Sequence, residues 1–353
     1  MSWKLPRASY LSRSPEVRLS PAGRVLRVVV DALIYLAHPR LMFTFRQYLG
    51  YWPRPALPLR YHEKYLWRKI FDHDPRQAAL ADKLAAKAHV RKHWPDIRVP
   101  ALYWEGDDPD GIPEEILAGD CAIKANHGSG MNVLVSRGAV DRAELKAQAR
   151  RWLRRRFGRR HHEWAYSQIA PRLFAEQLLV DDGVPASPVY KANVAGGECI
   201  YVYAHYTPAP GVEMEAVFDR DGRSRAALMD SGEMGTAMEP PAQLDELMRT
   251  AERLAAGFDF LRVDLYAIGS DIWFSEFTFY GAAGYAWVDD IGLLSTLNRK
   301  WDIGLSWFLS TPQSGFKGAY ARLLRAWLTT ADVPMRHGGP AALDPRRQHT
   351  SSI

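Results

Sequence analysis

The chain has 353 residues, of which 47% are hydrophobic and 24% are charged. This composition is that of an ordinary globular protein with room for two or three structural units, and it excludes a largely disordered chain. The formal net charge of +6 favours anionic partners such as phosphates, acidic glycans, nucleic acid or an anionic membrane surface.

The N-terminal part of the chain contains a long apolar run at residues 25–43. Arg27, Asp31 and His38 interrupt this run before it reaches the ~18 apolar residues that a membrane span needs. No small-residue cleavage site follows, so the run does not predict a signal peptide. We expect a cytoplasmic protein, and the sequence leaves open whether residues 25–50 contact the inner face of the membrane as an interfacial helix.

The predicted elements alternate between helices and strands without an internal repeat. Helical spacing predicts two helices within residues 60–94, separated at Asp74 and Pro75, and later helices over residues 141–158, 241–258 and 316–329. Strand-like segments occupy residues 96–104, 121–125, 173–180, 188–206 and 259–279. This order indicates the α+β class. Cys121 and Cys199 lie inside strand-like segments, where we expect buried free thiols.

Residues 259–279 predict a β-hairpin with a three-residue turn at 269–271. This register sets Asp264 opposite Glu276, and Arg262 opposite Thr278, on one face, while an apolar face packs on the core. Facing carboxylates repel each other unless a positive charge lies between them. Arg262 or a shared proton could compensate the repulsion, and Mg²⁺, which prefers oxygen ligands, would do so better. A surface hairpin with scattered charges is the alternative.

A second feature is Lys124, which ends a strand-like segment directly before the glycine-containing loop at 126–130. A Walker A loop carries its lysine after its second glycine, so this order excludes that motif. By itself, a glycine turn beside a lysine is also compatible with an ordinary solvated loop.

Seven segments follow one another along the chain from about residue 60 to about residue 290. They read HEKYLWRKIFDHDP, LADKLAAKAHV, IKANHGSGMN, EWAYSQIAPRLFAEQLL, YKANVAGG, GFDFLRVDLY and FSEFTFYGAAG. Together they resemble the TupA-like ATP-grasp family, named for teichuronopeptide biosynthesis. The resemblance implies an α+β ATP-grasp fold, in which two α+β subdomains sandwich a nucleotide, with a helical N-terminal extension.

This fold implies five parts of the chain. Residues 1–59 would be a partly disordered N-terminal extension with the candidate interfacial helix, and residues 60–119 an α/β region that leads into the grasp. Residues 120–186 would form the subdomain with the phosphate loop and the adenine hinge. Residues 187–330 would form the subdomain with the metal-binding hairpin, and residues 331–353 a disordered tail.

The resemblance also assigns site residues position by position. It gives the phosphates of ATP to Lys83, Lys124, Lys191 and the covering loop of His127, Gly128, Ser129 and Gly130. It gives the adenine to Glu176, whose carboxylate would accept from the amine, and to the backbone at Gln177 and Leu178. The ribose falls to Asp182, with Asp181 as the other candidate, and Mg²⁺ to Asp264, Glu276 and Thr278. Ser275 departs from the family pattern, since relatives commonly have glycine before the glutamate.

For function, the resemblance implies an ATP- and Mg²⁺-dependent carboxylate–amine ligase in cell-surface polysaccharide biosynthesis. ATP would convert a uronate-type carboxylate on an acidic glycan to an acylphosphate, which an amine or amino acid then attacks. Lys124 and Arg262 would be the catalytic residues, Lys124 at the phosphates and Arg262 at the charge that develops on the acyl centre.

Two alternatives stay open. One is an ATP-dependent glycan kinase, and the other is a non-catalytic ATP- or glycan-binding partner of a glycosyltransferase complex. The arginine run at residues 150–160 could contact glycan, lipid or a partner protein. Nucleic acid is not expected, because the aromatic residues do not interleave at stacking intervals.

Overall fold

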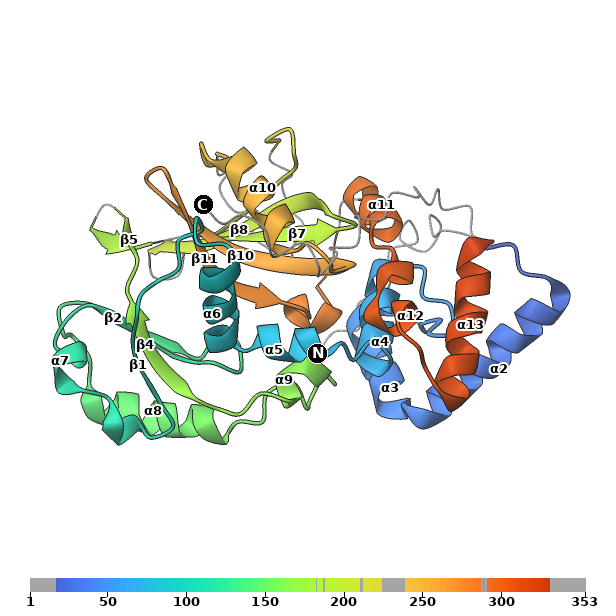
Figure 1. The fold of residues 1–353 in the computed structure, drawn as a ribbon, viewed down its shortest axis with the longest axis horizontal. Helices are drawn as coiled ribbons and strands as arrows, with labels where there is room; N and C mark the ends of the chain where they lie inside the picture. The colour runs from blue at the N-terminus through green and yellow to red at the C-terminus, as the bar shows by residue number, and fades with distance from the viewer. Residues whose placement is uncertain are drawn as a thin grey trace, which may run out of the picture.

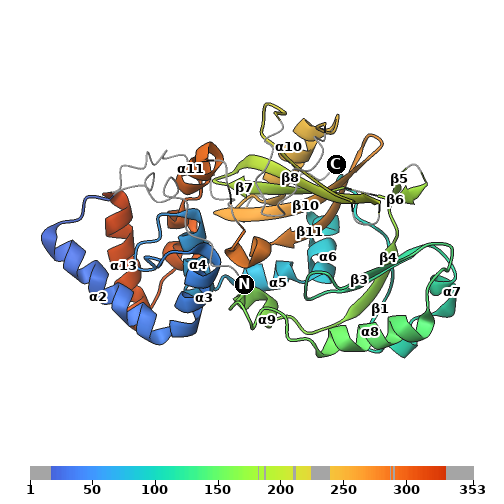
Figure 2. The same ribbon diagram turned by 180° about the vertical axis from the view of Figure 1, so that it is seen from behind.

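The computed structural model describes residues 17–181, 183–186, 188–209, 212–223, 239–286, 288 and 291–330. Within them, the chain folds into two larger antiparallel sheets and one two-stranded sheet, with flanking helices, and a helical region lies at one end of the molecule (Figures 1 and 2). This arrangement confirms the predicted α+β class. The predicted tail at 331–353 and residues 1–16 of the predicted extension lie outside the described residues.

The described helices are α2 (Pro21–Ala37), α3 (Pro39–Leu49), α4 (Tyr61–Ile70), α5 (Pro75–Ala81), α6 (Lys83–His93), α7 (Glu114–Leu117), α8 (Arg142–Arg154), α9 (Trp164–Ser167), α10 (Leu244–Leu254), α11 (Ile291–Lys300), α12 (Trp307–Ser310) and α13 (Gly315–Thr329). The prediction of two helices within 60–94 is wrong, because three form there. Asp82 adopts an extended conformation and its carboxylate accepts from the amides of Leu84 and Ala85, which starts α6 as a new helix.

The described strands are β1 (Leu102–Gly106), β2 (Cys121–Ala125), β3 (Asn132–Val135), β4 (Leu173–Gln177), β5 (Val180–Asp181), β6 (Val184–Pro185), β7 (Val189–Ala195), β8 (Glu198–Ala209), β9 (Val212–Phe218), β10 (Phe260–Ile268) and β11 (Asp271–Thr278). A small sheet has the order β1-β4-β2-β3, and a large sheet has the order β11-β10-β7-β8-β9. The strands β5 and β6 pair with each other alone.

Each sheet buries one face under a helix. The amphipathic helix α10 packs Leu247, Met248 and Ala251 toward β7, β8 and β10 of the large sheet. The helix α8 covers the small sheet and buries Leu145 and Trp152 in a separate apolar cluster. The helix α6 packs against β11 and lies between the two sheets (Figures 1 and 2). Cys121 and Cys199 are buried free thiols, as predicted.

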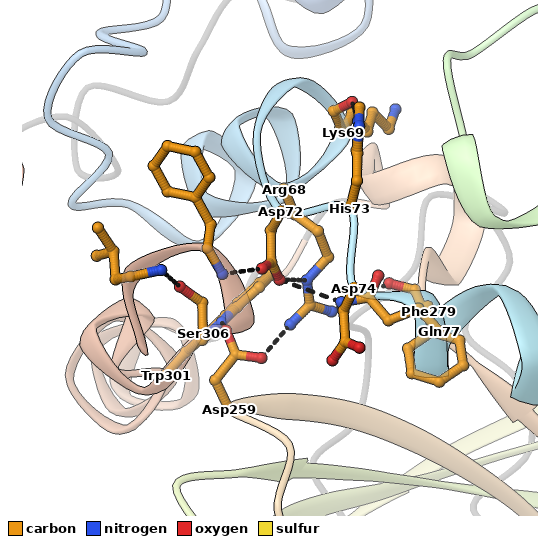
Figure 3. A network of polar contacts seen from close by, with 12 residues as sticks. Arg68, Lys69, Asp72, His73, Asp74, Gln77, Asp259, Phe279, Trp301 and Ser306 are labelled. Carbon is orange, nitrogen blue, oxygen red and sulfur yellow. Dashed lines mark hydrogen bonds and ion pairs between the residues drawn. The ribbon is translucent and has the colours of Figure 1, made fainter. Parts of the chain in front are cut away.

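Arg68 of α4 is the centre of a buried polar network that joins the helical region to the large sheet (Figure 3). Its guanidinium donates to Asp259 Oδ1 at 2.6 Å and to the carbonyl of Phe279 at 3.3 Å. The other carboxylate oxygen of Asp259 accepts from Trp301 Nε1 at 2.6 Å. Asp259 directly precedes β10 and Phe279 directly follows β11, so the network fixes both open ends of the hairpin.

Asp72 extends this network toward the C-terminal helices. Its carboxylate accepts from the amide of Phe308 at 2.9 Å and from Gln77 Nε2 at 3.1 Å, and it lies 3.8 Å from Arg68 Nε. Burial, helped by the nearby Asp259 carboxylate, raises the pKa of Asp72 to about 7.

The N-terminal helices are attached to the same core. Val30 and Ile34 of α2, and Leu41 and Phe45 of α3, are buried in the main apolar cluster. Among the described helices, none alone is long and apolar enough to cross a membrane, although α2 and α3 meet the length and composition test as a pair bent by 99°.

Candidate active site

A cleft of about 900 Å³ lies between the two sheets. Lys83 at the start of α6, Lys124 on β2 and Lys191 on β7 line it, together with Asp264 on β10 and Glu276 on β11. Residues 128–132, after β2, form a further part of the wall. The structure therefore gathers the predicted phosphate lysines, the glycine loop and the two hairpin carboxylates around one space.

Strand alternation explains why Lys124 reaches the cleft. Cys121 and Ile123 of β2 lie in the apolar cluster under α8, so Lys124, one residue on, projects from the opposite face of the sheet. On the neighbouring strand β4, Leu173 and Ala175 occupy the same cluster. Glu176 consequently projects to the same side as Lys124.

Glu176 holds two lysines beneath the cleft. Its carboxylate is 1% exposed and lies 2.7 Å from Lys124 Nζ and 3.1 Å from Lys87 Nζ. Both carboxylate oxygens face lysines in the structure, and the contact with an adenine amine stays a prediction. Lys87 lies on α6 at the fourth position after Lys83, on the same side of the helix, and the sequence analysis missed it.

Burial and charge act against each other in this cluster. Burial lowers the pKa of Lys87 to about 8, although Glu176 opposes that change. Burial would also lower the pKa of Lys124, but Glu176 more than compensates and raises it. Burial alone would raise the pKa of Glu176, and the two lysines together lower it instead. Lys124 therefore stays cationic at neutral pH.

Asn126 fixes the start of the glycine loop. Its side-chain amide donates to the carboxylate of Asp82 at 2.8 Å, and its Oδ1 accepts from the amide of Arg172 at 2.8 Å. Its main-chain carbonyl accepts from the amide of Lys83 at 3.1 Å. A single side chain thus joins α6, the end of β2 and the segment before β4, which explains an asparagine at this position.

The glycines of the loop have different reasons to be glycine. A Cβ on Gly128 would lie 2.0 Å from Met131 Cε and 2.8 Å from the ring of Phe157, so the loop packs too closely there for a side chain. Gly130 has φ of +66°, a backbone conformation that side chains disfavour. Gly128, Ser129 and Gly130 all line the cleft, where the sequence analysis expected them.

His127 does not face the cleft. Its ring is buried, and its Nε2 lies 3.2 Å from the carbonyls of Trp152 and Arg155 at the end of α8. Its Nδ1 lies 3.2 Å from Asn126 Oδ1. Burial lowers the pKa of the ring. In this position the side chain supports the loop against the end of α8 and does not line the cleft, where the sequence predicted it.

Lys83 contacts both sides of the cleft. Its Nζ donates to the carbonyl of Gly128 at 2.5 Å and lies 2.9 Å from Glu276 Oε2. Burial alone would raise the pKa of Glu276, but Lys83 first and then Arg262 and Lys124 lower it, so this carboxylate is ionised at neutral pH.

The facing carboxylates occur at the open end of the hairpin, as predicted. Asp264 pairs with Glu276 and Arg262 pairs with Thr278 in the ladder of β10 and β11. The guanidinium of Arg262 donates to both oxygens of Asp264 at 2.7 Å and to Thr278 Oγ1 at 3.0 Å. Burial raises the pKa of Asp264 against this pairing, and Glu276 adds to the effect. Thr278 is buried and is not among the described residues that line the cleft.

The turn end of the same hairpin differs from the prediction. Ile268 pairs with Asp271, so the turn contains two residues rather than three, and Tyr266 pairs with Trp273. A β-bulge between Asp264 and Leu265 on the ladder, opposite Ser275, restores the predicted register at the carboxylates. The bulge also turns Phe274 into the core, where it is fully buried.

Of the remaining residues predicted to bind the nucleotide, one lines the cleft, two do not, and one lies outside the described residues. The amide of Gln177 donates to the carbonyl of Ala101 at 2.8 Å, and Leu178 is buried. Neither is among the described residues that line the cleft. Lys191 lines the cleft with its Nζ 5.1 Å from the ring centroid of Tyr203. Asp182 lies outside the described residues.

An aromatic section of the cleft was missed by the sequence analysis. Tyr61, Tyr65 and Tyr201 line it near Arg262, and the hydroxyls of Tyr61 and Tyr65 lie 3.4 Å apart. A strained turn, in which Ala282 and Ala283 have φ of 45° and 52°, adjoins this section. The sequence signal for this section was the spacing of Tyr61 and Tyr65, which lie four residues apart and therefore on the same side of a predicted helix.

Two sheets that enclose a cleft lined by lysines, a glycine loop and an acidic hairpin are the arrangement of an ATP-grasp protein. A comparison with protein families supports this class, because the description "TupA-like ATPgrasp" matches residues 63–291. The match covers more than half of the chain, and the chain belongs to this family. A comparison with curated proteins finds no match.

Solved structures similar to this chain include two proteins that are described as ligases. ATP-grasp ligase PsnB, complexed with a minimal precursor, is 18% identical, with 65% of this chain and 64% of that chain covered and a TM-score of 0.35. D-alanine–D-alanine ligase from Bacillus anthracis, complexed with ATP, is 14% identical, with 71% and 66% covered and a TM-score of 0.37. The chain thus spans slightly less than two thirds of the PsnB chain.

Proposed function

We propose that the protein is an ATP- and Mg²⁺-dependent carboxylate–amine ligase. The observation that carries this proposal is the cleft that is lined both by Lys83, Lys124 and Lys191 and by the carboxylates of Asp264 and Glu276. Lysines suit polyphosphate as point charges, and paired carboxylates suit a cation that arrives with the phosphates. Membership of an ATP-grasp family supports ATP as the substrate. A precursor, ADP and Mg in the PsnB structures, and ATP in the D-alanine–D-alanine ligase structure, support the same assignment.

The residues present fit a magnesium ion of the kind that accompanies ATP. Mg²⁺ commonly takes one or two carboxylates, with phosphate oxygens and water as its other ligands, and Asp264 and Glu276 offer two carboxylates on paired positions. A bound Mg²⁺ would act as a Lewis acid that neutralises phosphate charge. Thr278 is the weaker candidate, because its hydroxyl is neutral and the residue is not among the described residues that line the cleft.

The residues of the chain then have separate tasks. Lys124, oriented by Glu176, and Lys83 bind the phosphates of ATP, while the backbone of Gly128 and Gly130 lies against them. An acceptor carboxylate oxygen attacks the γ-phosphorus, and ADP leaves. The amine then attacks the acyl carbon, and phosphate leaves. Arg262, a permanent cation in the cleft, stabilises the charge on the acyl centre, and the assignment of Arg262 and Lys124 as catalytic residues stays a prediction.

For the acceptor, the proposal is a uronate-type group on an acidic cell-surface glycan, with an amine or amino acid as the second substrate. Tyr61, Tyr65 and Tyr201 support a hydroxyl-rich ring, since tyrosines offer both a flat apolar face and hydrogen-bonding groups. We place the protein in the cytoplasm, at the inner face of the membrane, where it could work beside a glycosyltransferase.

The test supplies purified protein with Mg-ATP, a uronate-containing oligosaccharide and a mixture of amino acids. The expected result is release of ADP and of phosphate in equal amounts, in step with amide formation detected by mass spectrometry. Release of ADP with transfer of phosphate to the glycan would instead identify a kinase. An enzymatic role would be contradicted if neither amide formation nor phosphate transfer were detected, and if Lys124→Met and Asp264→Asn variants produced the same cell-surface glycan as wild type in cells.

A further inference from the structure

Among the residues that the structure describes, none covers one apolar face of the helix α2. The exposed side chains are Val25, Leu26, Val28, Val29, Leu33 and Leu36, which are 42% to 78% exposed. At 100° per residue they fall on one side of the helix, opposite the buried Val30 and Ile34. Soluble monomers seldom expose a contiguous apolar patch of this kind without a function.

We propose that this outer face of α2 is a docking surface for an anionic lipid membrane. The proposal is independent of the reaction that the cleft catalyses, because it concerns the other end of the molecule (Figures 1 and 2).

The helix is fixed with this face outward. Asp31, on the inner side, accepts from the guanidinium of Arg27 at 2.6 Å and from the amide of Ala56 at 2.8 Å. The hydroxyl of Tyr35 donates to the carbonyl of Pro53 at 2.8 Å. These contacts hold the inner side of α2 against the segment after α3, so the helix cannot rotate to bury its outer face.

The charges around the outer face are positive. Residues 17–52 contain five arginines, and their sole acidic residue is Asp31, which Arg27 already pairs. Arg18, Arg24 and Arg40 are exposed at the two ends of α2. Exposed Phe43 and Trp52 add aromatic side chains of the type found at membrane interfaces. An apolar helix face flanked by arginines is typical of helices that lie in the plane of an anionic membrane.

The arginine run that the cleft does not use lies beside these helices. His38 and Leu41 line one pocket with Gly158, Arg159 and His162, and the ring of Tyr48 lies 5.9 Å from that of His161. Arg154, Arg155, Arg156, Arg159 and Arg160 are exposed, and no ion pair is recorded for them within the described part of the chain. Both views place α3, α8 and α9 along one edge of the molecule (Figures 1 and 2).

A lipid surface fits these features better than a second copy of the chain. Two copies that packed α2 against α2 would bring Arg18, Arg24 and Arg40 of each copy together, with no acidic residue free on this helix to compensate. Anionic headgroups supply that compensation, and each arginine near such a surface contributes about 1 kcal/mol, or about a fivefold change in affinity.

The test measures sedimentation of the full chain with vesicles of phosphatidylglycerol and phosphatidylcholine, and with vesicles of phosphatidylcholine alone. We expect binding to the anionic vesicles that weakens with added salt. Val29→Asp and Leu36→Asp should each lower the affinity about tenfold or more, because a charge replaces an inserted apolar side chain. Leu305→Asp is the matched control, since Leu305 is 50% exposed elsewhere and should leave binding unchanged.

A second pair of variants tests the arginine run. Arg155→Gln with Arg156→Gln should lower the affinity for anionic vesicles roughly fivefold for each arginine, whereas Arg249→Gln on α10 should not. Light scattering of the same samples gives the oligomeric state. Absence of vesicle binding, equal binding to neutral vesicles, or a dimer that Leu36→Asp dissociates would each overturn the proposal.

Discussion

Lys124 and Glu176 meet across the neighbouring strands β2 and β4, with 2.7 Å between Nζ and Oε1. In the ladder Lys124 stands opposite Phe174, so Glu176 is its diagonal neighbour two residues on. The carboxylate also pairs with Lys87, which places one buried anion between two cations. The buried Glu176 carboxylate therefore orients the Lys124 side chain.

Glu176→Gln tests this relationship. The variant should bind ATP about tenfold more weakly, because Lys124 loses its orienting partner, and should lose about 3 kcal/mol of stability, because Lys87 remains buried without a countercharge. Nucleotide titration and guanidinium unfolding measure the two effects. Glu105→Gln, in the half-exposed pair with Arg172, is the control and should change stability by less than about 1 kcal/mol. Equal effects of both variants would contradict the role given to Glu176.

Asp264→Asn and Glu276→Gln test the hairpin carboxylates. Each should lower kcat about 100-fold or more and raise the Mg²⁺ concentration needed for half-maximal rate, since each removes one anionic ligand. Asp271→Asn is the control on the same hairpin, because its carboxylate pairs with Arg98 at the surface. If the magnesium dependence of the two variants matched that of Asp271→Asn, the carboxylates would not be the ligands.

Arg68→Met tests the buried network of Figure 3. Removal of the guanidinium leaves Asp259 and Asp72 buried without their cation, so we expect a loss of about 3–5 kcal/mol in the free energy of unfolding. Arg76→Met, which removes a half-exposed partner of Asp74, should cost less than about 1 kcal/mol. Denaturant unfolding compares the two, and a small loss for Arg68→Met would show that the network contributes little.

Asp72→Asn tests the pH dependence of stability. The pKa of Asp72 is raised from 3.8 to about 7 by burial, so the folded protein keeps a proton that the unfolded chain releases. This group therefore lowers the stability of the wild type as pH rises from about 4 to about 7, by about 1.4 kcal/mol per pH unit at most. Asn keeps an acceptor for Phe308 and cannot ionise. Denaturant unfolding at several pH values should show that the free energy of unfolding of the variant rises relative to that of the wild type over this window. Parallel plots of this free energy against pH would contradict the raised pKa of Asp72.

The hairpin shows how far the sequence could lead. Period-2 alternation placed Asp264 opposite Glu276 correctly, although the turn contains two residues and not three. The bulge at Ser275 restores the predicted register at the open end of the hairpin. Between the bulge and the turn the register stays shifted by one residue, so Phe274 lies in the core and Trp273 does not. A bulge has no sequence signature that alternation can detect, because one unpaired residue simply changes the face of its neighbours.

Side-chain direction in the nucleotide half was the harder part. Motif order located Lys83, Lys124 and the loop residues 128–130, all of which line the cleft. It could not show that His127 turns toward α8, because that direction depends on packing around Gly128. The same limit applies to Arg68 and Asp259, which are 191 positions apart in the chain and meet only through the tertiary fold.

The position of Lys83 links the binding of an anion in the cleft to the contacts between the two sides of the cleft. Its ammonium lies between the carbonyl of Gly128, which belongs to the small-sheet side, and the carboxylate of Glu276, which belongs to the large sheet. An anion that binds Lys83 competes with both of these oxygens. When the anion displaces either oxygen, the contact that Lys83 makes between the two sides of the cleft is weakened. The rigidity of the protein should therefore change with each turnover, and hydrogen exchange in the loop and in β11 should rise and fall together.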